Sequence, residues 1–312
     1  MAKFSSAPIY VSWNYTYACN LNCSHCYSRA TSYPAELDTQ GYLSIADQLA
    51  EACVFKVGLG GGEPLIRKDC YRIVRQMSDA GIETNITTNG WFVNADTAKR
   101  LADAGLSVLY VSVDSPVEVE HDRFRRMPGS YRRAINAVKF TAEAGIRVKF
   151  STVVSTLNAR ALSAVATLAA EAGAGGVEFK RFRPAGNGMT SNGTWALQDA
   201  DEGAIKEEIG RLKKTSPLDI ALIYGADPDG ETDSGCPCGI RSICIRPNGD
   251  VSPCAYGEAV IGNLMQERLV HMWRDSPILN AMRSGGGCVA LTEQPFPSNP
   301  YLHEQPQTRV VQ

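Results

Sequence analysis

Three cysteines lie within eight residues near the start of the chain, in the stretch YACNLNCSHCYS (residues 17–28). Cys19, Cys23 and Cys26 are spaced as Cys-x3-Cys-x2-Cys. Three thiolates on one loop can hold three corners of an iron–sulfur cubane, which leaves one iron without a protein ligand. Zinc is the rival, with His25 as a further ligand in a structural site or a water in a catalytic one. The pattern predicts a metal or cluster site.

Five further cysteines occur in the last quarter of the chain. They are Cys236, Cys238, Cys244, Cys254 and Cys288. The segment ICIRPNGDVSPC (243–254) is typical of a hairpin, because two short runs flank the turn residues Pro-Asn-Gly-Asp. A hairpin can direct several thiolates to one cluster. Cys53 and Cys70 lie singly in apolar periodic segments, and we expect both to be core residues.

Composition and charge indicate the partners and the cellular compartment of the protein. Among 312 residues, Lys and Arg number 31 and Asp and Glu 33, so the net charge of −2 argues against a general nucleic-acid partner. The first residues lack the apolar run of a signal peptide, and no stretch approaches the roughly 20 apolar residues of a membrane span. We expect a cytoplasmic protein with no membrane partner, where clustered cysteines bind metal rather than form disulfides.

Strand-like and helical runs alternate about every 25–35 residues between residues 8 and 215. The strand-like runs are 9–15, 54–61, 83–89, 106–114, 146–154 and 176–182. Four helical runs end in Ala-Gly, where glycine supplies the left-handed closing residue. Crossovers of this length imply parallel strands.

The fold class predicted by this alternation is α/β, as a partial (βα)6 TIM-like barrel. Six units fit a partial barrel better than the full one, which typically needs ~250 residues. A doubly wound sheet is the alternative. We expect the barrel over residues 1–215, and a small extension of hairpin and helix over 216–312.

Function in parallel βα folds collects at the carboxyl ends of the strands. The three cysteines follow the first strand, GLGGGEP (58–64) the second, TTNG (87–90) the third and SVDS (112–115) the fourth. These loops therefore lie on one rim, where a site is expected.

The motif CNLNCSHCY resembles the signature of radical S-adenosylmethionine (SAM) enzymes, and the resemblance covers about residues 8–285. It implies that Cys19, Cys23 and Cys26 hold a [4Fe-4S] cluster whose open iron chelates SAM. In that family one electron cleaves SAM to methionine and a 5′-deoxyadenosyl radical, which abstracts a substrate hydrogen. An external donor of flavodoxin or ferredoxin type supplies the electron.

The same resemblance assigns SAM-binding roles to residues on the other loops. Their positions are Tyr27, Gly61, Gly62, Glu63, Asn89, Ser112, Asp114 and Arg125. Gly61-Gly62-Glu63-Pro64 resembles the GGEP motif, whose backbone and glutamate meet the SAM amino group. Backbone near Tyr27 meets adenine.

Ser112 and Asp114 resemble the ribose-binding residues, Asn89 lines the rim, and Arg125 approaches the SAM carboxylate. Ordinary structural roles are the alternatives: a helix cap for Ser112 and Asp114, an Asn-Gly turn at Asn89, and a solvated basic face at Arg125.

The C-terminal cysteines resemble the SPASM/twitch extensions of these enzymes, which implies one auxiliary [4Fe-4S] cluster because a further cysteine-rich run is missing. Cys238, Cys244, Cys254 and Cys288 would be the ligands, with Cys236 spare. An alternative set is Cys236, Cys238, Cys244 and Cys288, with Cys254 free. The spare thiol is either inert or a hydrogen-atom donor to a substrate radical, as an epimerase requires.

Only about ten residues precede the first strand, so we expect no N-terminal leader-binding domain and favour a small-molecule substrate. Acidic residues in 118–122 and 225–233 could attract a polycation, although a solvated linker explains them too. In the second stretch they are Asp227, Asp229, Glu231 and Asp233. The combination of modest length, one auxiliary cluster, a spare cysteine and acidic loops resembles aminoglycoside epimerases of the neomycin type, which use a cysteine hydrogen donor.

Three alternatives remain open. The first is a peptide maturase that forms crosslinks, and the second is a sugar or cyclitol dehydrogenase. The third is a non-enzymatic zinc-binding protein, which would be colourless and would not bind SAM.

Overall fold

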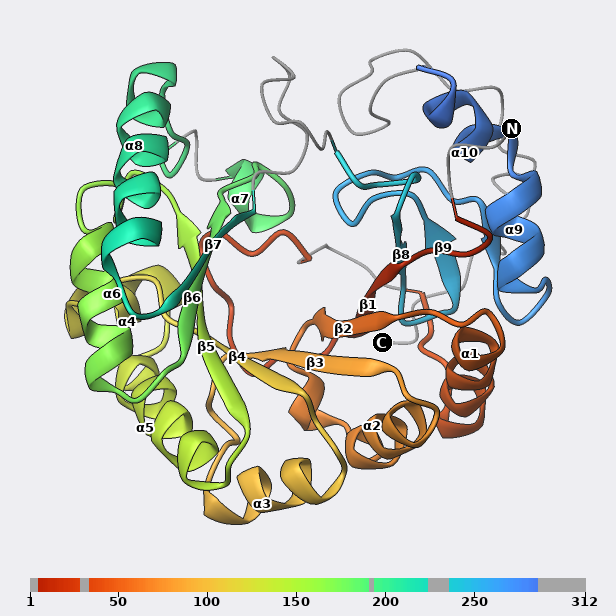
Figure 1. Ribbon diagram of the computed structural model, residues 1–312, viewed down its shortest axis with the longest axis horizontal. Coiled ribbons are helices and arrows are strands. Elements are labelled where there is room, and N and C mark those ends of the chain that lie inside the picture. Colours follow the sequence, from red (N-terminus) through yellow and green to blue (C-terminus); the bar gives the residue numbers. More distant parts are fainter. Residues whose placement is uncertain (1–4, 29–33, 191–193, 224–235, 286–312) are drawn as a thin grey trace, which may run out of the picture.

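The computed structural model describes residues 5–28, 34–190, 194–223 and 236–285. Parallel strands form an open arc with helices on its outer side (Figure 1). The strands are β1 (Tyr10–Thr16), β2 (Lys56–Gly61), β3 (Glu83–Thr88), β4 (Val108–Ser112), β5 (Arg147–Val154), β6 (Gly176–Arg181), β7 (Asp219–Ile223), β8 (Ser242–Ile245), β9 (Asp250–Ser252) and β10 (Gly262–Asn263).

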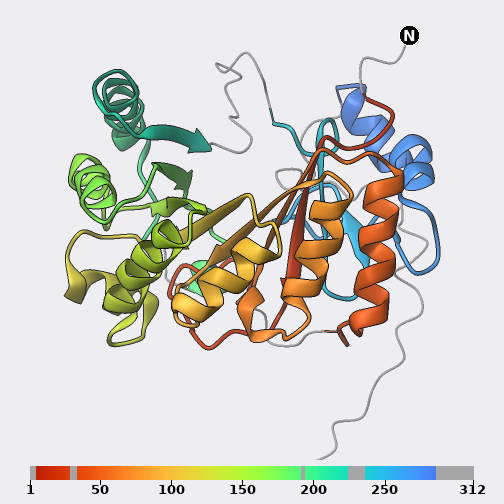
Figure 2. The ribbon, with the colours of Figure 1, turned by 60° about the horizontal axis from the view of Figure 1, so that its bottom comes forward.

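Most helices of the described residues cover the outer face of the arc or lie in the extension (Figure 2), whereas the short helix Asn187–Thr190 lies against the cysteine loop, where Asn187 N donates to Cys26 O. They are α1 (Thr39–Glu51), α2 (Cys70–Asp79), α3 (Ala95–Asp103), α4 (Glu118–Arg125), α5 (Ser130–Glu143), α6 (Leu162–Glu171), α7 (Asn187–Thr190), α8 (Asp199–Thr215), α9 (Leu269–Asp275) and α10 (Pro277–Arg283), with a 3₁₀ turn at Pro64–Ile66.

One sheet joins all the strands, in the order β10-β9-β8-β1-β2-β3-β4-β5-β6-β7. The pairs from β1 to β7 are parallel, as the crossover lengths predict. The predicted α/β class and partial barrel are therefore confirmed. β7 follows the proposed boundary at residue 215 and still pairs in parallel with β6. The division into 1–215 and 216–312 stays a proposal.

Side chains of the strands alternate between two faces, because successive Cβ atoms point to opposite sides of a sheet. In β1, Val11, Trp13 and Tyr15 are fully buried in the main hydrophobic core. Tyr10 and Ser12, on the other face, line a cavity inside the arc. The alternation thus separates a structural face from a face that is free to form a site.

The four Ala-Gly endings close helices as predicted. Ala80, Ala104, Ala144 and Ala172 are the C-cap residues. The glycines that follow them have φ values between 77° and 87°. This is the left-handed region, which glycine adopts without the steric cost of a Cβ.

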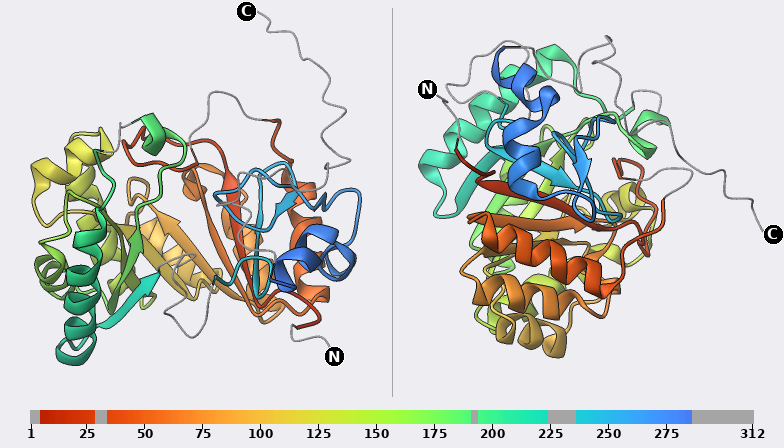
Figure 3. Two further views of the ribbon diagram at one scale, coloured as in Figure 1. Left: turned by 90° about the horizontal axis from the view of Figure 1, so that it is seen from above. Right: turned by 90° about the vertical axis from the view of Figure 1, so that its right-hand side faces the viewer.

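The predicted hairpin and helix form the extension. β8 and β9 pair antiparallel around the turn that contains Gly249, and α9 carries the buried Trp273. β8 also pairs in parallel with β1, so the extension lies beside the first strand of the barrel (Figure 3). β1 thus pairs with β2 of the barrel on one side and with β8 of the extension on the other.

The two isolated cysteines differ. Cys70 is fully buried in the core, as expected. Cys53 is exposed, and its φ of 53° is left-handed, because it follows the last turn of α1 rather than continuing an apolar face. Among the described residues no helix combines the length and apolar character that crossing a bilayer requires.

Candidate active site

The cysteine loop follows β1 and opens onto a cavity of about 220 Å³ inside the arc. Cys19, Cys23 and Cys26 all line this cavity, together with residues from the ends of β2 to β6. Cys23 is buried, and the other two thiols are half-buried. The loops that the sequence placed on one rim therefore do surround one space.

Hydrogen-bond donors approach the three sulfur atoms. The Leu21 N–H donates to Cys19 Sγ at 3.4 Å, and Arg125 Nη1 lies 4.0 Å from Cys23 Sγ. Ser28 Oγ and Cys26 Sγ lie 3.4 Å apart, and either can be the donor. Burial raises the pKa of Cys23 to about 11, and Arg125 opposes this shift by favouring the thiolate, the form that ligates metal.

The donor set fits a cluster better than one metal ion. Within the described ranges, no three His, Cys, Asp or Glu side chains converge closely enough to hold a single ion. His25, the further ligand of the structural-zinc hypothesis, is half-buried, and its ring is stacked 4.1 Å from that of Phe124. Three thiols spread around a cavity match the separate corners of a cubane.

The Gly61-Gly62-Glu63 loop lies directly against the cysteine loop. The Gly62 N–H donates to Thr16 O at 2.7 Å, and the Glu63 N–H donates to Ala18 O at 2.8 Å. A Cβ at Gly62 would lie 2.1 Å from Ala18 O, so a larger residue would separate the two loops. Gly61 and Gly62 line the cavity, which leaves their backbone available to a ligand.

Glu63 lies behind this loop, and its role at the SAM amino group stays a prediction. Its side chain is fully buried, and its carboxylate accepts hydrogen bonds from Thr88 Oγ1 (2.8 Å), Asn89 N (2.8 Å) and Leu65 N (3.2 Å). Burial raises the pKa of Glu63 to about 7, although these hydrogen bonds oppose the shift. Glu63 thus joins the loops after β2 and β3.

Asp114 is likewise absent from the described residues that line the cavity, and its ribose-binding role stays a prediction. Its carboxylate, fully buried, pairs with Arg125 Nη2 at 2.7 Å and Nε at 2.8 Å, and accepts from Val153 N at 2.9 Å. Ser112 and Arg125 do line the cavity. Arg125 is buried rather than solvated, so its basic charge faces Cys23 with Asp114 as its counter-ion.

Asn89 and Tyr27 both line the cavity, as expected. Asn89 Nδ2 donates to Asn20 Oδ1 at 2.9 Å, within the cysteine loop. The Tyr27 hydroxyl donates to Asn14 Oδ1 at 2.9 Å, and its ring centroid lies 5.1 Å from that of Tyr256. Tyr256 comes from the extension, so aromatic contact links the two cysteine regions.

The cysteines of the extension gather at the hairpin. The thiols of Cys236 and Cys254 both hydrogen-bond with that of Cys238, which raises the pKa of Cys238 and lowers that of Cys254 to about 7. Cys244 is buried in β8. Cys288 lies outside the described residues.

The two candidate hydrogen donors, Cys236 and Cys254, are absent from the described residues that line the cavity, whereas Tyr256 is present. Their thiols instead contact Cys238. An epimerase that quenches a radical with one of them would need that thiol at the cavity.

Among the described residues, the charged side chains that line the cavity are basic, a feature that sequence reasoning missed. They are Arg125, Lys180, Arg181 and Arg183. The three acidic residues in 118–122 make local contacts: Glu118 pairs with Arg132, Glu120 accepts from Ser115, and Asp122 accepts from the start of α5. The acidic residues of 225–233 lie outside the described residues.

Comparisons with known proteins agree with this geometry. The model of the Radical SAM superfamily matches residues 13–168. The SPASM model, an iron–sulfur cluster-binding domain, matches residues 236–295. The chain belongs to the radical SAM superfamily. Its cofactors are therefore a [4Fe-4S] cluster and SAM, with auxiliary iron–sulfur binding in the SPASM region.

Two similar proteins align with most of this radical SAM chain. Mycofactocin maturase MftC of Mycobacterium tuberculosis is 31% identical over 300 residues, covering 90% of this chain and 75% of that one. AdoMet-dependent heme synthase of Methanosarcina barkeri is 28% identical over 306 residues, covering 91% and 87%.

A solved structure, SuiB of Streptococcus suis bound to precursor peptide SuiA, superimposes with a TM-score of 0.75 at 18% identity, covering 90% of this chain and 68% of that one. That likeness supports the fold. None of these three names is that of an aminoglycoside epimerase, so the epimerase expectation lacks support.

Proposed function

We propose that this radical SAM enzyme modifies a peptide, forming a new bond or an unsaturation at a carbon from which a hydrogen atom is removed. The observation that carries the proposal is the 31% identity to a mycofactocin maturase over 300 residues, a span long enough to include both cysteine regions. The precursor peptide bound by SuiB, a protein of similar fold, is consistent with it.

In this proposal Cys19, Cys23 and Cys26 hold the SAM-binding cluster. When bound, the reduced cluster would supply one electron to SAM, and the resulting 5′-deoxyadenosyl radical would abstract one substrate hydrogen. The second hydrogen would leave as a proton, and its electron would pass to the auxiliary cluster. Arg125 balances thiolate charge beside Cys23, and its position at the cavity also allows contact with the SAM carboxylate. An external flavodoxin or ferredoxin remains the predicted electron donor.

The neighbouring loops orient SAM. Gly61 and Gly62 offer backbone groups to the methionine part, while Ser112 and Asn89 offer polar side chains at the same cavity. Backbone beside Tyr27 contacts adenine. Glu63 acts from behind the loop through its bonds to Thr88 and Asn89.

We further propose a single auxiliary cluster in the extension. Cys238, Cys244 and Cys254, with Cys288, are the favoured ligands, because the Cys254 thiol contacts that of Cys238. Cys236 contacts the same thiol, so the set of Cys236, Cys238, Cys244 and Cys288 stays the alternative.

The lining of the cavity supports a substrate with carboxylate groups over a polycation. Lys180 and Arg181 face the cavity with Glu178 and Glu202 as their respective partners, and Arg183 lies beside them. Because Glu178, Glu202 and Asp114 neutralise Lys180, Arg181 and Arg125, the preference for carboxylates over a polycation is weak and comes from the direction of these side chains rather than from net charge.

The test uses the full chain reconstituted anaerobically with iron and sulfide, then incubated with SAM, reductant and short peptides encoded beside its gene, in D2O. Deoxyadenosine and peptide mass are measured together. Loss of two hydrogens from one peptide, with deoxyadenosine formed in step, is the expected result. The Cys19/Cys23/Cys26 triple alanine variant is the control, and it should lose about half of the iron and all SAM cleavage.

Other products would contradict the proposal and indicate a different activity. Uptake of one deuterium without loss of mass would restore the epimerase reading. A ketone formed on a sugar or cyclitol would identify a dehydrogenase. Conversion of a heme precursor with no peptide modified would favour the second candidate, a heme-synthase-like activity. The 28% identity to a heme synthase and the basic cavity both support that candidate.

A further inference from the structure

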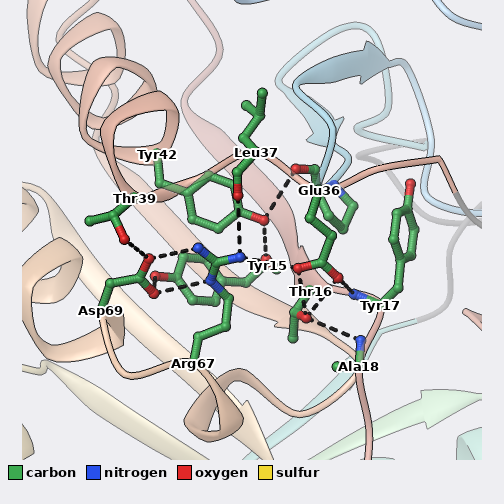
Figure 4. A network of polar contacts seen from close by, with 11 residues as sticks. Tyr15, Thr16, Tyr17, Ala18, Glu36, Leu37, Thr39, Tyr42, Arg67 and Asp69 are labelled. Carbon is green, nitrogen blue, oxygen red and sulfur yellow. Dashed lines mark hydrogen bonds and ion pairs between the residues drawn. The ribbon is translucent and has the colours of Figure 1, made fainter.

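The Glu36 carboxylate holds the end of β1, directly before the cysteine loop (Figure 4). Its Oε1 accepts from Thr16 Oγ1 at 2.9 Å and from Tyr17 N at 2.6 Å. Thr16 Oγ1 in turn accepts from Ala18 N at 3.0 Å. Two backbone N–H groups immediately before Cys19 are thereby fixed by one carboxylate and the hydroxyl that it binds.

The Arg67 guanidinium connects this carboxylate to a second one. Its Nη1 donates to Glu36 at 3.1 Å, while Nε and Nη2 form a fork with Asp69 at 3.0 and 2.6 Å. The planar group lies 4.1 Å from the centre of the Tyr42 ring, and its side chain is 18% exposed. Among basic side chains, only arginine has a planar guanidinium that can form two parallel hydrogen bonds to a carboxylate while its face stacks on an aromatic ring.

The same residues reach the hairpin of the extension. The Tyr42 hydroxyl donates to Tyr15 O at 2.6 Å and to Pro247 O at 3.1 Å. The Leu37 N–H also donates to Pro247 O, at 3.0 Å. Pro247 lies in the turn between β8 and β9, so the network of Glu36, Arg67, Asp69 and Tyr42 contacts both cysteine-bearing parts of the chain.

We propose that Glu36 and Arg67 are positioning residues for the SAM-binding site. Neither is among the described residues that line the cavity, so they act through backbone. Glu36 accepts from Tyr17 N and, through the Thr16 hydroxyl, fixes Ala18 N. The carbonyls of Thr16 and Ala18 in this segment accept hydrogen bonds from the N–H groups of Gly62 and Glu63. Arg67 holds Glu36 in place. The distance between the cluster ligands and the loop that meets SAM thus depends on this ion pair. The inference does not depend on which substrate the enzyme modifies.

The test compares Arg67→Met and Glu36→Gln with the wild type, each as the full chain with reconstituted clusters. The electron paramagnetic resonance spectrum of the reduced protein is recorded with and without SAM, and KM for SAM is separated from kcat of deoxyadenosine formation. We expect iron content to be retained, the SAM-induced spectral change to diminish, and KM to rise by roughly tenfold, as is typical when groups behind metal ligands are removed.

Arg100→Met is the matched control. Arg100 also stacks on a tyrosine, with its guanidinium 3.8 Å from the Tyr71 ring centre, and also pairs with a carboxylate, Asp96 at 4.0 Å, but on the outer helices. It should behave as the wild type. If Arg67→Met gives the same spectra and KM as Arg100→Met, the proposal is wrong.

A milder variant covers the case in which Arg67→Met does not fold. Thr16→Val keeps the shape of the side chain and removes only the hydroxyl that joins Glu36 to Ala18 N. The same weakened response to SAM is expected. An unchanged response in a folded Thr16→Val protein would overturn the positioning role.

Discussion

At the scale of single residues, charge and burial decide what each polar group can do. Asp114 and Arg125 form an ion pair beneath the cysteine loop, with 0% and 8% of their side chains exposed. Opposite charges that are removed from water stabilise one another only as a pair. Asp114 therefore keeps the Arg125 guanidinium beside Cys23.

Asp114→Asn should destabilise the fold by about 3–5 kcal/mol, because it leaves the Arg125 charge buried without a counter-ion. Denaturant unfolding of the reconstituted protein measures this. Asp96→Asn is the control, since the Asp96–Arg100 pair is exposed and worth at most about 0.5 kcal/mol. Equal losses for the two variants would contradict the prediction.

The buried side chain of His121 predicts how stability depends on pH. Its Nδ1 accepts from Asp114 N at 3.2 Å, and burial lowers its pKa to about 4. The imidazole binds a proton more readily in the unfolded chain, at a pKa of about 6.5. Its stabilisation is thus complete above pH 6.5 and is lost as pH falls towards 4.

We expect His121→Gln to flatten the fall in unfolding free energy between pH 7 and 5, by about 1.4 kcal/mol per pH unit at most. Urea unfolding at several pH values measures the slope. A variant with the wild-type slope would show that His121 is not the group responsible.

At the scale of elements, the contact between the cysteine loop and the glycine loop depends on the missing side chain of Gly62. Gly62→Ala would place a methyl group 2.1 Å from Ala18 O, a backbone atom that cannot move without the cysteine loop. Turnover should fall on the order of 100-fold, the cost of misplacement by about 1 Å. Deoxyadenosine formation measures this.

Gly203→Ala is the control, because a Cβ at Gly203 in α8 meets nothing within 4 Å and Gly203 does not line the cavity. It should keep most of its activity. A Gly62→Ala enzyme as active as Gly203→Ala would show that the two loops need not touch.

At the scale of the whole molecule, the extension is bound to the barrel by strand pairing and by buried polar groups. Ser12 of β1 pairs with Cys244 of β8, so the two cysteine regions share neighbouring strands. Gln48 of α1 completes the attachment: Nε2 donates to Leu264 O at 2.8 Å, and Oε1 accepts from Leu269 N at 3.1 Å.

Gln48→Leu should lower stability by about 1–3 kcal/mol, because it leaves a buried carbonyl and a buried N–H without partners. Limited proteolysis should cut the extension faster than in the wild type. Gln76→Leu, which removes a comparable bond to Leu43 O on α1 but far from the extension, is the control. Equal protection of the extension in both variants would argue against the role of Gln48.

The sequence by itself determined the elements and the place of the site. Six alternating strands, the Ala-Gly helix ends and the cysteine loop after β1 follow from local patterns, since period, capping and loop position are properties of neighbouring residues. The Cys-x3-Cys-x2-Cys spacing likewise identified the superfamily.

Only the tertiary structure decided which polar groups face the cavity. Glu63 and Asp114 lie in motifs that predict ligand contact, yet their carboxylates are bound by Thr88 and Arg125 behind it. Glu36 and Arg67 carry no motif, because their importance comes from partners distant in sequence. The sequence does not show whether the partner of a carboxylate is a ligand or a buried arginine. Only the distances in the folded chain distinguish the two cases.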